Sequence, residues 1–224
     1  MIPRILHQVR IGVKKTPTED ENRLLRSFHD LNPGWEVMVW DDDRVRSCLT
    51  KHYTILRIRP FIIAADIIRL MALEQYGGMY LDLDVACGGC VDDFLKPDKI
   101  HIVNIWADVN GVVNHQFYYD WSNNWMLASP ANHPLMSHIA EKALSNALFV
   151  PAETRAQKIC DIAGPIFIGQ CAKKYPEDIF LVGYKYLYEL YCLQQVNPPS
   201  NPILIHLAES SWQSKNPPQP IHPL

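Results

Sequence analysis

The segment from Asp66 to Asp84 places a helix, a glycine pair and a strand in direct succession. It reads DIIRLMALEQYGGMYLDLD. The mostly apolar run up to Tyr76 predicts a helix, and Gly77 is the residue type that most readily adopts the left-handed conformation ending one. Residues 79–85, which are apolar apart from Asp82 and Asp84, then predict a strand. This order favours an α/β fold.

Two carboxylates, Asp82 and Asp84, close this segment. They are two residues apart, and side chains alternate across a strand with period two, so we expect both on the same side of a 79–85 strand. Like charges this close repel each other. A shared divalent cation keeps both ionised, and carboxylate oxygens suit magnesium, manganese or calcium.

An acid and a base, Asp66 and Arg69, lie within the expected helix. Three residues apart, they share one helix face in an apolar stretch. One interpretation is a structural ion pair. The other is a ligand site, because the helix ends close to the two aspartates and ligands bind at the carboxyl ends of strands in open α/β sheets.

The rest of the chain also alternates between strand and helix patterns. We expect strands over 5–9, 36–40, 100–106, 112–119, 179–182 and 203–206, and helices over 19–31, 45–50, 60–76, 132–149 and 166–174. The acidic triplet 41–43 is interpreted as a helix N-cap. His206 ends the last strand, before Ser211 and Trp212. It is either a surface residue or part of a metal and diphosphate site.

Composition limits the class of protein. The chain has 224 residues, 48% of them hydrophobic, with no compositional break, so we expect one domain over 1–224. A net charge of −3 with scattered Lys and Arg argues against nucleic acid as a partner. Neither a signal peptide nor an apolar run long enough for a membrane span is present, so we expect a soluble cytoplasmic protein.

Six cysteines are expected to be reduced. Cys87 and Cys90 have the spacing of half a zinc site or a redox pair, but a structural zinc site needs four ligands and no second pair follows. The alternative is a tight glycine turn.

Several motifs together resemble a known family, the glycosyltransferases of family 32 with a DXD sugar-binding motif. Its relatives include fungal initiating mannosyltransferases and the glucosylating domains of clostridial toxins. The matching segments are IPRILHQ at 2–8, NPGW at 32–35, WDD at 40–42, ADIIR at 65–69, YGGMYLDLD at 76–84, NWMLASPANHP at 124–134, AGP at 163–165, and His206 through Ser211 and Trp212.

This resemblance implies a GT-A fold, in which a single Rossmann-like mixed sheet is flanked by helices. It also implies a retaining hexosyltransferase that binds a nucleotide-sugar with Mn²⁺ or Mg²⁺. A UDP-sugar is the favoured donor, GDP-mannose is possible, and a glycan or glycoprotein is the expected acceptor.

The resemblance also implies roles for individual residues. Asp84 would bind the metal, together with Asp82 and His206, and Asp82 would also contact ribose and sugar hydroxyls. Asp66 and Arg69 would hold the transferred sugar. The remaining substrate contacts fall on His7, the backbone of Gln8 and Val9, Tyr80, Ser211 and Trp212. The sequence departs from the family at Arg10, where relatives often have a tryptophan that can stack on the base.

Two other functions fit the same residues. A strand ending in D-x-D also resembles haloacid-dehalogenase-type phosphohydrolases, with Asp82 as nucleophile and Asp84 as acid. That motif needs a downstream lysine and an acidic pair at a strand end, and Asp92 and Asp93 lie too close to supply the pair. The third hypothesis is a module that binds a nucleotide-sugar but does not catalyse sugar transfer. The aromatic and amide residues of 106–125 suit either an acceptor sugar or a packed cluster.

Overall fold

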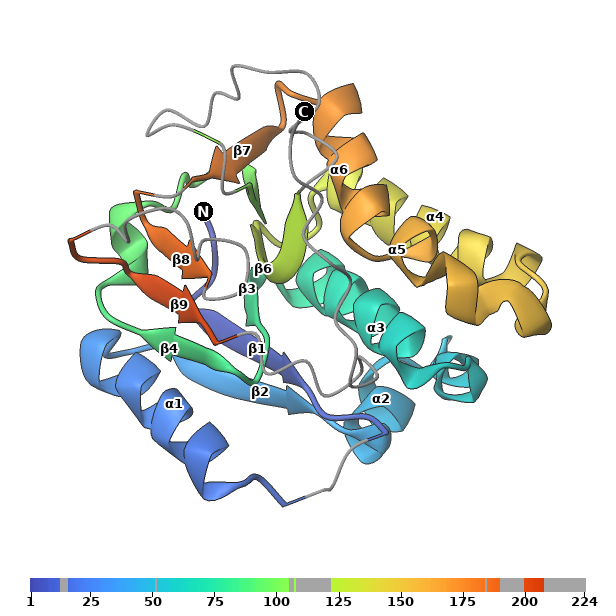
Figure 1. Ribbon diagram of the computed structural model, residues 1–224, viewed down its shortest axis with the longest axis horizontal. Helices are drawn as coiled ribbons and strands as arrows, with labels where there is room; N and C mark the ends of the chain where they lie inside the picture. The colour runs from blue at the N-terminus through green and yellow to red at the C-terminus, as the bar shows by residue number, and fades with distance from the viewer. Residues whose placement is uncertain are drawn as a thin grey trace, which may run out of the picture.

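A computed structural model of the chain describes residues 1–12, 16–50, 52–104, 107, 122–183, 185–189 and 200–207. Its centre is a six-stranded mixed sheet in the order β2-β1-β3-β6-β5-β7 (Figure 1). The strands are β1 (Ile5–Val9), β2 (Glu36–Trp40), β3 (Gly78–Leu81), β5 (Ile100–Val103), β6 (Asn123–Ser129) and β7 (Ile179–Val182). β6 runs antiparallel to both its neighbours, whereas β1 is parallel to β2 and β3, and β5 is parallel to β7. The predicted α/β fold with a mixed sheet is confirmed.

A second sheet, which the sequence did not predict, has three strands in the order β4-β9-β8. These are β4 (Val85–Cys87), β8 (Leu187–Glu189) and β9 (Leu204–His206). The predicted strand over 79–85 is therefore wrong in its second half. β3 ends at Leu81, and Asp82-Leu83-Asp84 forms a turn that carries the chain from the large sheet into the small one.

Helices cover both faces of the central sheet. The α-helices are α1 (Glu19–Leu31), α2 (Asp42–Cys48), α3 (Phe61–Tyr76), α4 (Pro134–Phe149), α5 (Ile159–Ile162) and α6 (Pro165–Lys174). Short 3₁₀ helices are η1 (Tyr53–Arg57), η2 (Val91–Asp93) and η4 (Ala152–Lys158). Figure 1 shows α3 to α6 on one side of the sheet, and α1 with the small sheet on the other. Among the described residues, no helix has both the length and the apolar character needed to cross a bilayer.

Alternation along β3 divides the interior into two cores. Tyr80 packs with α3, α4 and α6, whereas Met79 and Leu81 pack on the opposite face with Phe28 of α1 and with Leu204 of the small sheet. Because successive strand side chains point to opposite faces, a strand that is apolar throughout must be covered on both sides. This explains why β3, at the centre of the sheet, is buried along its whole length.

Local sequence signals account for the helix boundaries. α1 begins with a capping box, in which the Glu21 amide donates to Thr18 Oγ1 at 3.2 Å and the Thr18 amide donates to Glu21 Oε2 at 2.6 Å. Asp41 caps α2 by accepting from the Arg44 amide at 2.8 Å, which confirms the capping interpretation of the acidic triplet.

Glycines set the junction between α3 and β3. Gly77, with φ of 64°, ends α3. Gly78 has φ of 101°, and a Cβ there would lie 2.4 Å from the carbonyl oxygen of Ile5. Only glycine allows this conformation and this approach, so the pair lets β3 lie directly against β1.

Most of the predicted elements are present, with ends shifted by a few residues. The predicted strand over 112–119 and part of that over 100–106 lie outside the described residues, and β6 and β8 were not predicted. In the C-G-G-C segment, Cys87 ends β4 and the chain bends at Gly89. Cys87 Sγ donates to Gly89 O at 3.1 Å and accepts from Asn32 Nδ2 at 3.3 Å, and both Cys87 and Cys90 are free thiols.

Candidate active site

An ion pair inside α3 faces the end of β3. Asp66 and Arg69 are both buried, and Arg69 Nη2 lies 2.9 Å from Asp66 Oδ1. Asn124 Nδ2, at the start of β6, donates to the same oxygen at 2.9 Å, while Arg69 Nη1 donates to the Asn124 carbonyl at 2.6 Å. One residue of β6 thus fixes both members of the pair.

The same arginine connects α3 to the first aspartate of the motif. Arg69 Nη1 lies 3.4 Å from Asp82 Oδ1, and the hydroxyl of Tyr80 donates to this oxygen at 2.5 Å. The prediction that the helix face lies beside the strand end is confirmed in this geometry. Asp66, Arg69, Tyr80 and Asp82 form one connected network, which we call the Arg69 network.

Burial and charge shift the ionisation of this network. Desolvation raises the pKa of Asp66 to about 7, assisted by the negative charge of Asp82 and opposed by Arg69 and Asn124. Desolvation also raises the pKa of Asp82, against the opposing effects of Arg69 and Tyr80. For Arg69, burial disfavours the charge, but Tyr80, Asp66 and Asp82 together raise its pKa, so it is a permanent cation.

A second cluster contains the two aspartates of the motif and one histidine. Ligand atoms of Asp82, Asp84 and His206 all lie within 4.8 Å of one another, and His206 Nε2 is 3.4 Å from Asp84 Oδ1. Two carboxylates and an imidazole are a suitable donor set for Mn²⁺ or another divalent ion. Within the described part of the chain, this is the one group of acidic, histidine or cysteine side chains close enough to hold a metal.

The turn between the sheets, rather than strand alternation, assembles this cluster. Asp82 follows the last residue of β3, and its amide donates to the Trp125 carbonyl at 2.9 Å. Asp84 precedes β4, whose first residue, Val85, pairs with His206 of β9. The Leu207 amide also donates to the Asp84 carbonyl at 3.0 Å. Residues 122 positions apart in the sequence are therefore held in one place by backbone pairing.

Two residues have roles at this site that sequence reasoning did not assign to them, Asn124 and Trp125, although both lie in a matching motif and in the 106–125 region. The indole of Trp125 is buried and stacks on the His206 ring, with centroids 5.0 Å apart and planes inclined by 17°. The signal available in the sequence was their place directly before the apolar run that becomes the rest of β6. Because β6 is antiparallel to β3, the start of β6 lies beside the carboxyl end of β3, where ligands bind in open α/β sheets.

β1 carries three of the predicted substrate contacts, the side chain of His7 and the backbone of Gln8 and Val9. His7 is fully buried; its Nε2 bonds the Gly77 carbonyl at 2.7 Å and its Nδ1 accepts from the Trp40 indole at 3.0 Å. Both nitrogens therefore serve internal packing, and neither is available to a substrate in this arrangement. β1 pairs with β2 as far as Val9, but with β3 only as far as His7. On the side of β1 that faces β3, the backbone of Gln8 and Val9 is therefore outside the pairing of the two strands. The predicted contact with the base would form there.

The atypical Arg10 points toward the start of α1. Its Nη1 lies 3.1 Å from Glu21 Oε1, its Nη2 donates to the Thr16 carbonyl at 3.3 Å, and the side chain is buried. Arg10 therefore ties the segment after β1 to the capped end of α1. Ser211 and Trp212 lie outside the described residues.

Sequence comparison identifies relatives over the same region. Residues 18–102, which include both aspartates of the motif, match the family described as glycosyltransferase sugar-binding region containing DXD motif. The chain is 25% identical to the uncharacterized glycosyltransferase L373 of Acanthamoeba polyphaga mimivirus, over 95% of this chain and 84% of that protein. It is 26% identical to inositol phosphoceramide mannosyltransferase 1 of Schizosaccharomyces pombe, over 94% of this chain but only 62% of that protein.

Structural comparison agrees on the fold. PaToxG glycosyltransferase superposes with a TM-score of 0.56 at 20% identity, covering 79% of this chain and 70% of that one. A glycosyltransferase involved in glycosylation of the major capsid of PBCV-1 superposes with a TM-score of 0.52 at 12% identity, covering 93% and 95%. The three comparisons agree: residues 18–102 match the DXD-containing sugar-binding region of glycosyltransferases, the similar proteins are named as glycosyltransferases, and the fold is of the GT-A type.

Proposed function

We propose that this enzyme transfers a hexose from a nucleotide-sugar to an acceptor in a reaction that needs a divalent cation and retains the anomeric configuration. One observation carries the proposal. Asp82 belongs both to the metal-type cluster with Asp84 and His206 and to the Arg69 network. A diphosphate bound at the first and a sugar bound at the second would meet at this residue.

Mannose is the first sugar to test. Several relatives, 25–36% identical over different lengths, include proteins named as inositol phosphoceramide mannosyltransferases of S. pombe and mannosyl phosphorylinositol ceramide synthases of Saccharomyces cerevisiae. These names favour GDP-mannose as donor, although the wider family resemblance favours a UDP-sugar. The acceptor is a glycan, a glycoprotein or, following those names, a lipid with an inositol phosphate head group.

Asp82, Asp84 and His206 would hold the cation, which when bound neutralises charge developing on the departing nucleoside diphosphate. Arg69 adds a second fixed positive charge beside Asp82, without needing reorganisation, because Asp66, Asn124 and Asp82 already hold its guanidinium. The Arg69 network is thus oriented before the substrate arrives.

Asp66 would bind the transferred sugar. In the described part of the chain, Asn124 and Arg69 both bond its Oδ1, so Oδ2 is the atom open to a sugar hydroxyl. For a retaining reaction, the acceptor attacks from the side of the leaving group, and the departing phosphate accepts its proton. No separate protein base is required by that route.

The two alternatives fare differently. The phosphohydrolase interpretation is not supported, because the family match and the fold are those of glycosyltransferases. A binding module without turnover shares the fold and the ligands, so it must be separated from an enzyme by measuring turnover.

Isothermal titration with UDP-glucose, UDP-galactose and GDP-mannose, each with Mn²⁺ and with chelator, tests the donor site. We expect Mn²⁺-dependent binding of one donor, followed by its slow hydrolysis or transfer. The Asp84→Ala variant should lose both while keeping the circular dichroism spectrum of the wild type. Asp30→Ala, an exposed acid on α1, is the matched control. Normal turnover in Asp84→Ala would contradict the proposal, and binding without turnover would favour the binding module.

A further inference from the structure

Three exposed large hydrophobic side chains occur at one end of the molecule. Tyr53 of η1 is 48% exposed, and Leu148 and Phe149, the last residues of α4, are 63% and 84% exposed. Single exposed apolar residues are ordinary, but an adjacent Leu and Phe with a nearby Tyr form a patch. We call these three residues the α4-end patch.

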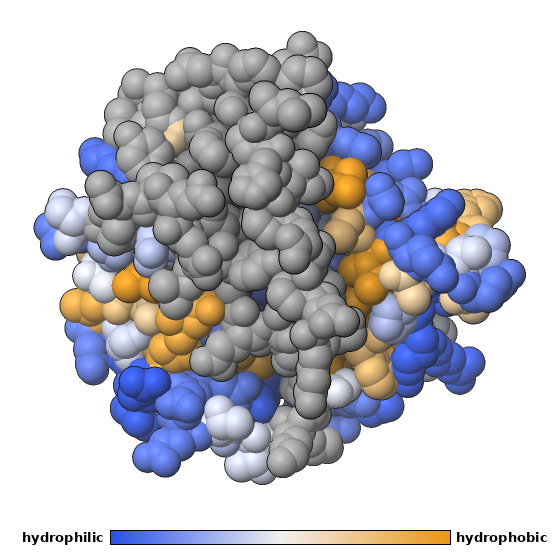
Figure 2. Space-filling model, in the orientation of Figure 1, coloured by the Kyte–Doolittle hydropathy of each residue, from blue (hydrophilic) through white to orange (hydrophobic). Residues whose placement is uncertain are grey.

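The packing of α4 on α3 brings the patch together. The start of α4 lies at the end of α3, where the Asn132 amide donates to the Glu74 carbonyl at 2.8 Å and Ser137 Oγ donates to Glu74 Oε1 at 3.2 Å. Two helices of equal length joined this way run antiparallel, so the end of α4 lies near the start of α3, which η1 also contacts. Figure 1 shows these ends on the same side of the molecule, and Figure 2 shows apolar surface set among hydrophilic side chains on that side.

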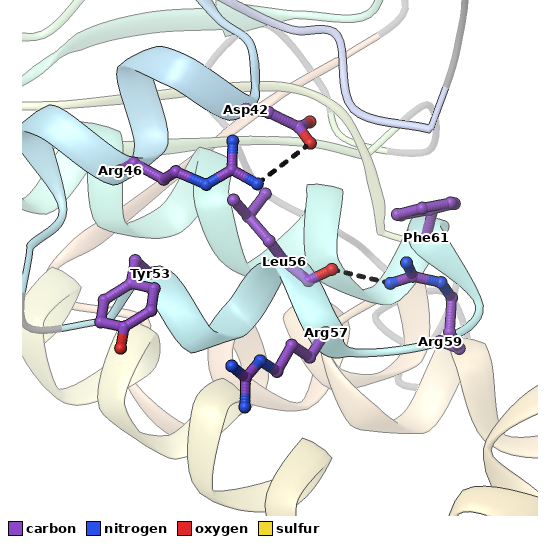
Figure 3. A pocket seen from close by; sticks show the side chains of 7 residues that line it. All are labelled: Asp42, Arg46, Tyr53, Leu56, Arg57, Arg59 and Phe61. Atoms are coloured by element: carbon purple, nitrogen blue, oxygen red, sulfur yellow. Dashed lines mark hydrogen bonds and ion pairs between the residues drawn. The ribbon is translucent and has the colours of Figure 1, made fainter.

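Arginines surround the same end of α3. Arg46, Arg57 and Arg59 line a hollow of about 240 Å³ whose other walls are formed by Asp42, Tyr53, Leu56 and Phe61 (Figure 3). None of these lining residues belongs to the cluster of Asp82, Asp84 and His206, so the hollow is separate from the candidate metal site. With three cations and one acid, it is electropositive.

The arginines keep most of their charge available to a ligand. The Arg59 guanidinium donates to the carbonyls of Leu56 and Ile58 and lies 3.6 Å from the Phe61 ring centroid, contacts that orient it without neutralising it. The ion pairs of Arg46 with described residues are exposed and long, at 3.8 Å to Asp42 and 3.6 Å to Asp43, and such pairs contribute little. Residues 44–65 contain five Lys or Arg and no acidic residue, although the whole chain is net negative.

We propose that the α4-end patch, together with Arg46, Arg57 and Arg59, docks onto the surface of an anionic lipid bilayer. Leu148 and Phe149 would enter the interface, and the arginines would contact lipid phosphates, which is the combination that peripheral membrane proteins use. A second copy of this chain is the less favourable occupant, because a two-fold contact through this face would bring its arginines opposite one another.

Docking in this orientation would place the donor site beside the bilayer. Phe61, which lines the hollow, packs against Gly12, just after the carboxyl end of β1, where a Cβ would come within 2.4 Å of the Phe61 ring. Asp66 lies five residues further along α3, or about 7.5 Å at the helical rise. If the proposed function holds, a lipid-linked acceptor would reach the site from the membrane. The docking itself does not depend on the donor or the metal.

Vesicle co-sedimentation tests the proposal with vesicles of phosphatidylcholine alone and of phosphatidylcholine mixed with phosphatidylserine. We expect binding to the mixed vesicles that weakens as salt rises. The Leu148→Ser/Phe149→Ser and Arg57→Gln/Arg59→Gln variants should each lose roughly tenfold or more in partition coefficient. The matched control is Leu31→Ser/Arg23→Gln on α1, which changes one exposed apolar residue and one exposed cation elsewhere. It should bind like the wild type.

Three results would overturn the proposal: no vesicle binding, equal binding to both vesicle types, or wild-type binding by both patch variants. Light scattering that shows a dimer dissolved by the Leu148→Ser/Phe149→Ser change would assign the patch to a second copy instead. The melting temperature of each variant tests whether it folds. If the Leu148→Ser/Phe149→Ser variant does not fold, Phe149→Ala takes its place. Donor hydrolysis in solution, measured on the same variants, should stay unchanged, so that failure of docking is distinguished from failure of the proposed function.

Discussion

Arg69 and Tyr80 converge on a single oxygen of Asp82. The guanidinium lies 4.3 Å from the centroid of the tyrosine ring, and both side chains contact Asp82 Oδ1, Arg69 at 3.4 Å and Tyr80 at 2.5 Å. A cation above an aromatic ring and a shared acceptor fix the carboxylate in one orientation. Asp82 can therefore present its second oxygen to a ligand with little loss of entropy on binding.

Replacing Arg69 with lysine should reduce kcat/KM by about 100-fold or more, because a single ammonium cannot contact Asp66, the Asn124 carbonyl and Asp82 together. Steady-state kinetics with the donor identified by titration would measure this. Arg23→Lys, in an exposed pair with Asp20, is the control and should retain wild-type kinetics. A small effect of Arg69→Lys would mean that charge alone, without the fork geometry, is sufficient.

The Trp125–His206 stack should control metal affinity. We expect Trp125→Leu to weaken Mn²⁺ binding by about tenfold, because it removes the flat surface that orients the imidazole. Trp125→Phe keeps an aromatic face and should retain most of the affinity. Calorimetric titration of Mn²⁺ into each variant, with thermal stability measured alongside, separates this positioning role from a loss of folding; equal affinities in the two variants would contradict it.

Burial of His7 should make stability depend on pH. Desolvation lowers its pKa from 6.5 to about 4, so between these values the unfolded chain binds a proton that the folded chain does not. The stabilising contribution is complete above pH 6.5 and is lost as pH falls through 4, amounting to about 3 kcal/mol at 1.36 kcal/mol per unit. Urea unfolding at several pH values measures the slope.

In that experiment His7→Gln should unfold more easily but with a shallower pH dependence over the same range. The matched control is His29→Gln, at an exposed position on α1, which should keep the wild-type slope. An unchanged slope in His7→Gln would place the titration on another group.

Gly78→Ala should destabilise the fold through a clash. Its φ of 101° and a Cβ 2.4 Å from the Ile5 carbonyl oxygen would force β3 away from β1. Gly34 also has a positive φ, of 85°, but the nearest atom to a Cβ there is the far end of Arg4 at 3.8 Å. We expect Gly34→Ala to cost about 1 kcal/mol and Gly78→Ala at least about twice that in free energy of unfolding. Equal costs would show that backbone conformation alone accounts for the glycine.

Sequence patterns predicted those elements whose signals are local. The Asp41 cap and the Gly77 helix stop each depend on residues within a few positions, and the structure has both. The pairing of Asp66 with Arg69 also follows from helical spacing.

Contacts made across the sheets could not be predicted in this way. The end of β3 at Leu81 depends on β4 joining β9, more than 100 residues later, and nothing in the DXD segment itself distinguishes a turn from a continued strand. The roles of Asn124 and Trp125 likewise depend on β6 lying antiparallel beside β3. Buried His7 was assigned to substrate from its motif, whereas its partners, Trp40 and Gly77, come from two other elements.

The turn from β3 into β4 has a further consequence for how this site can diversify. Asp82 and Asp84 fall inside the matched family region, 18–102, whereas His206 enters from β9 through pairing of main-chain atoms with β4. Backbone pairing does not depend on the side chain at position 206. The residue at the third position of the candidate metal cluster can therefore change while the two aspartates and the arginine beside them stay as they are.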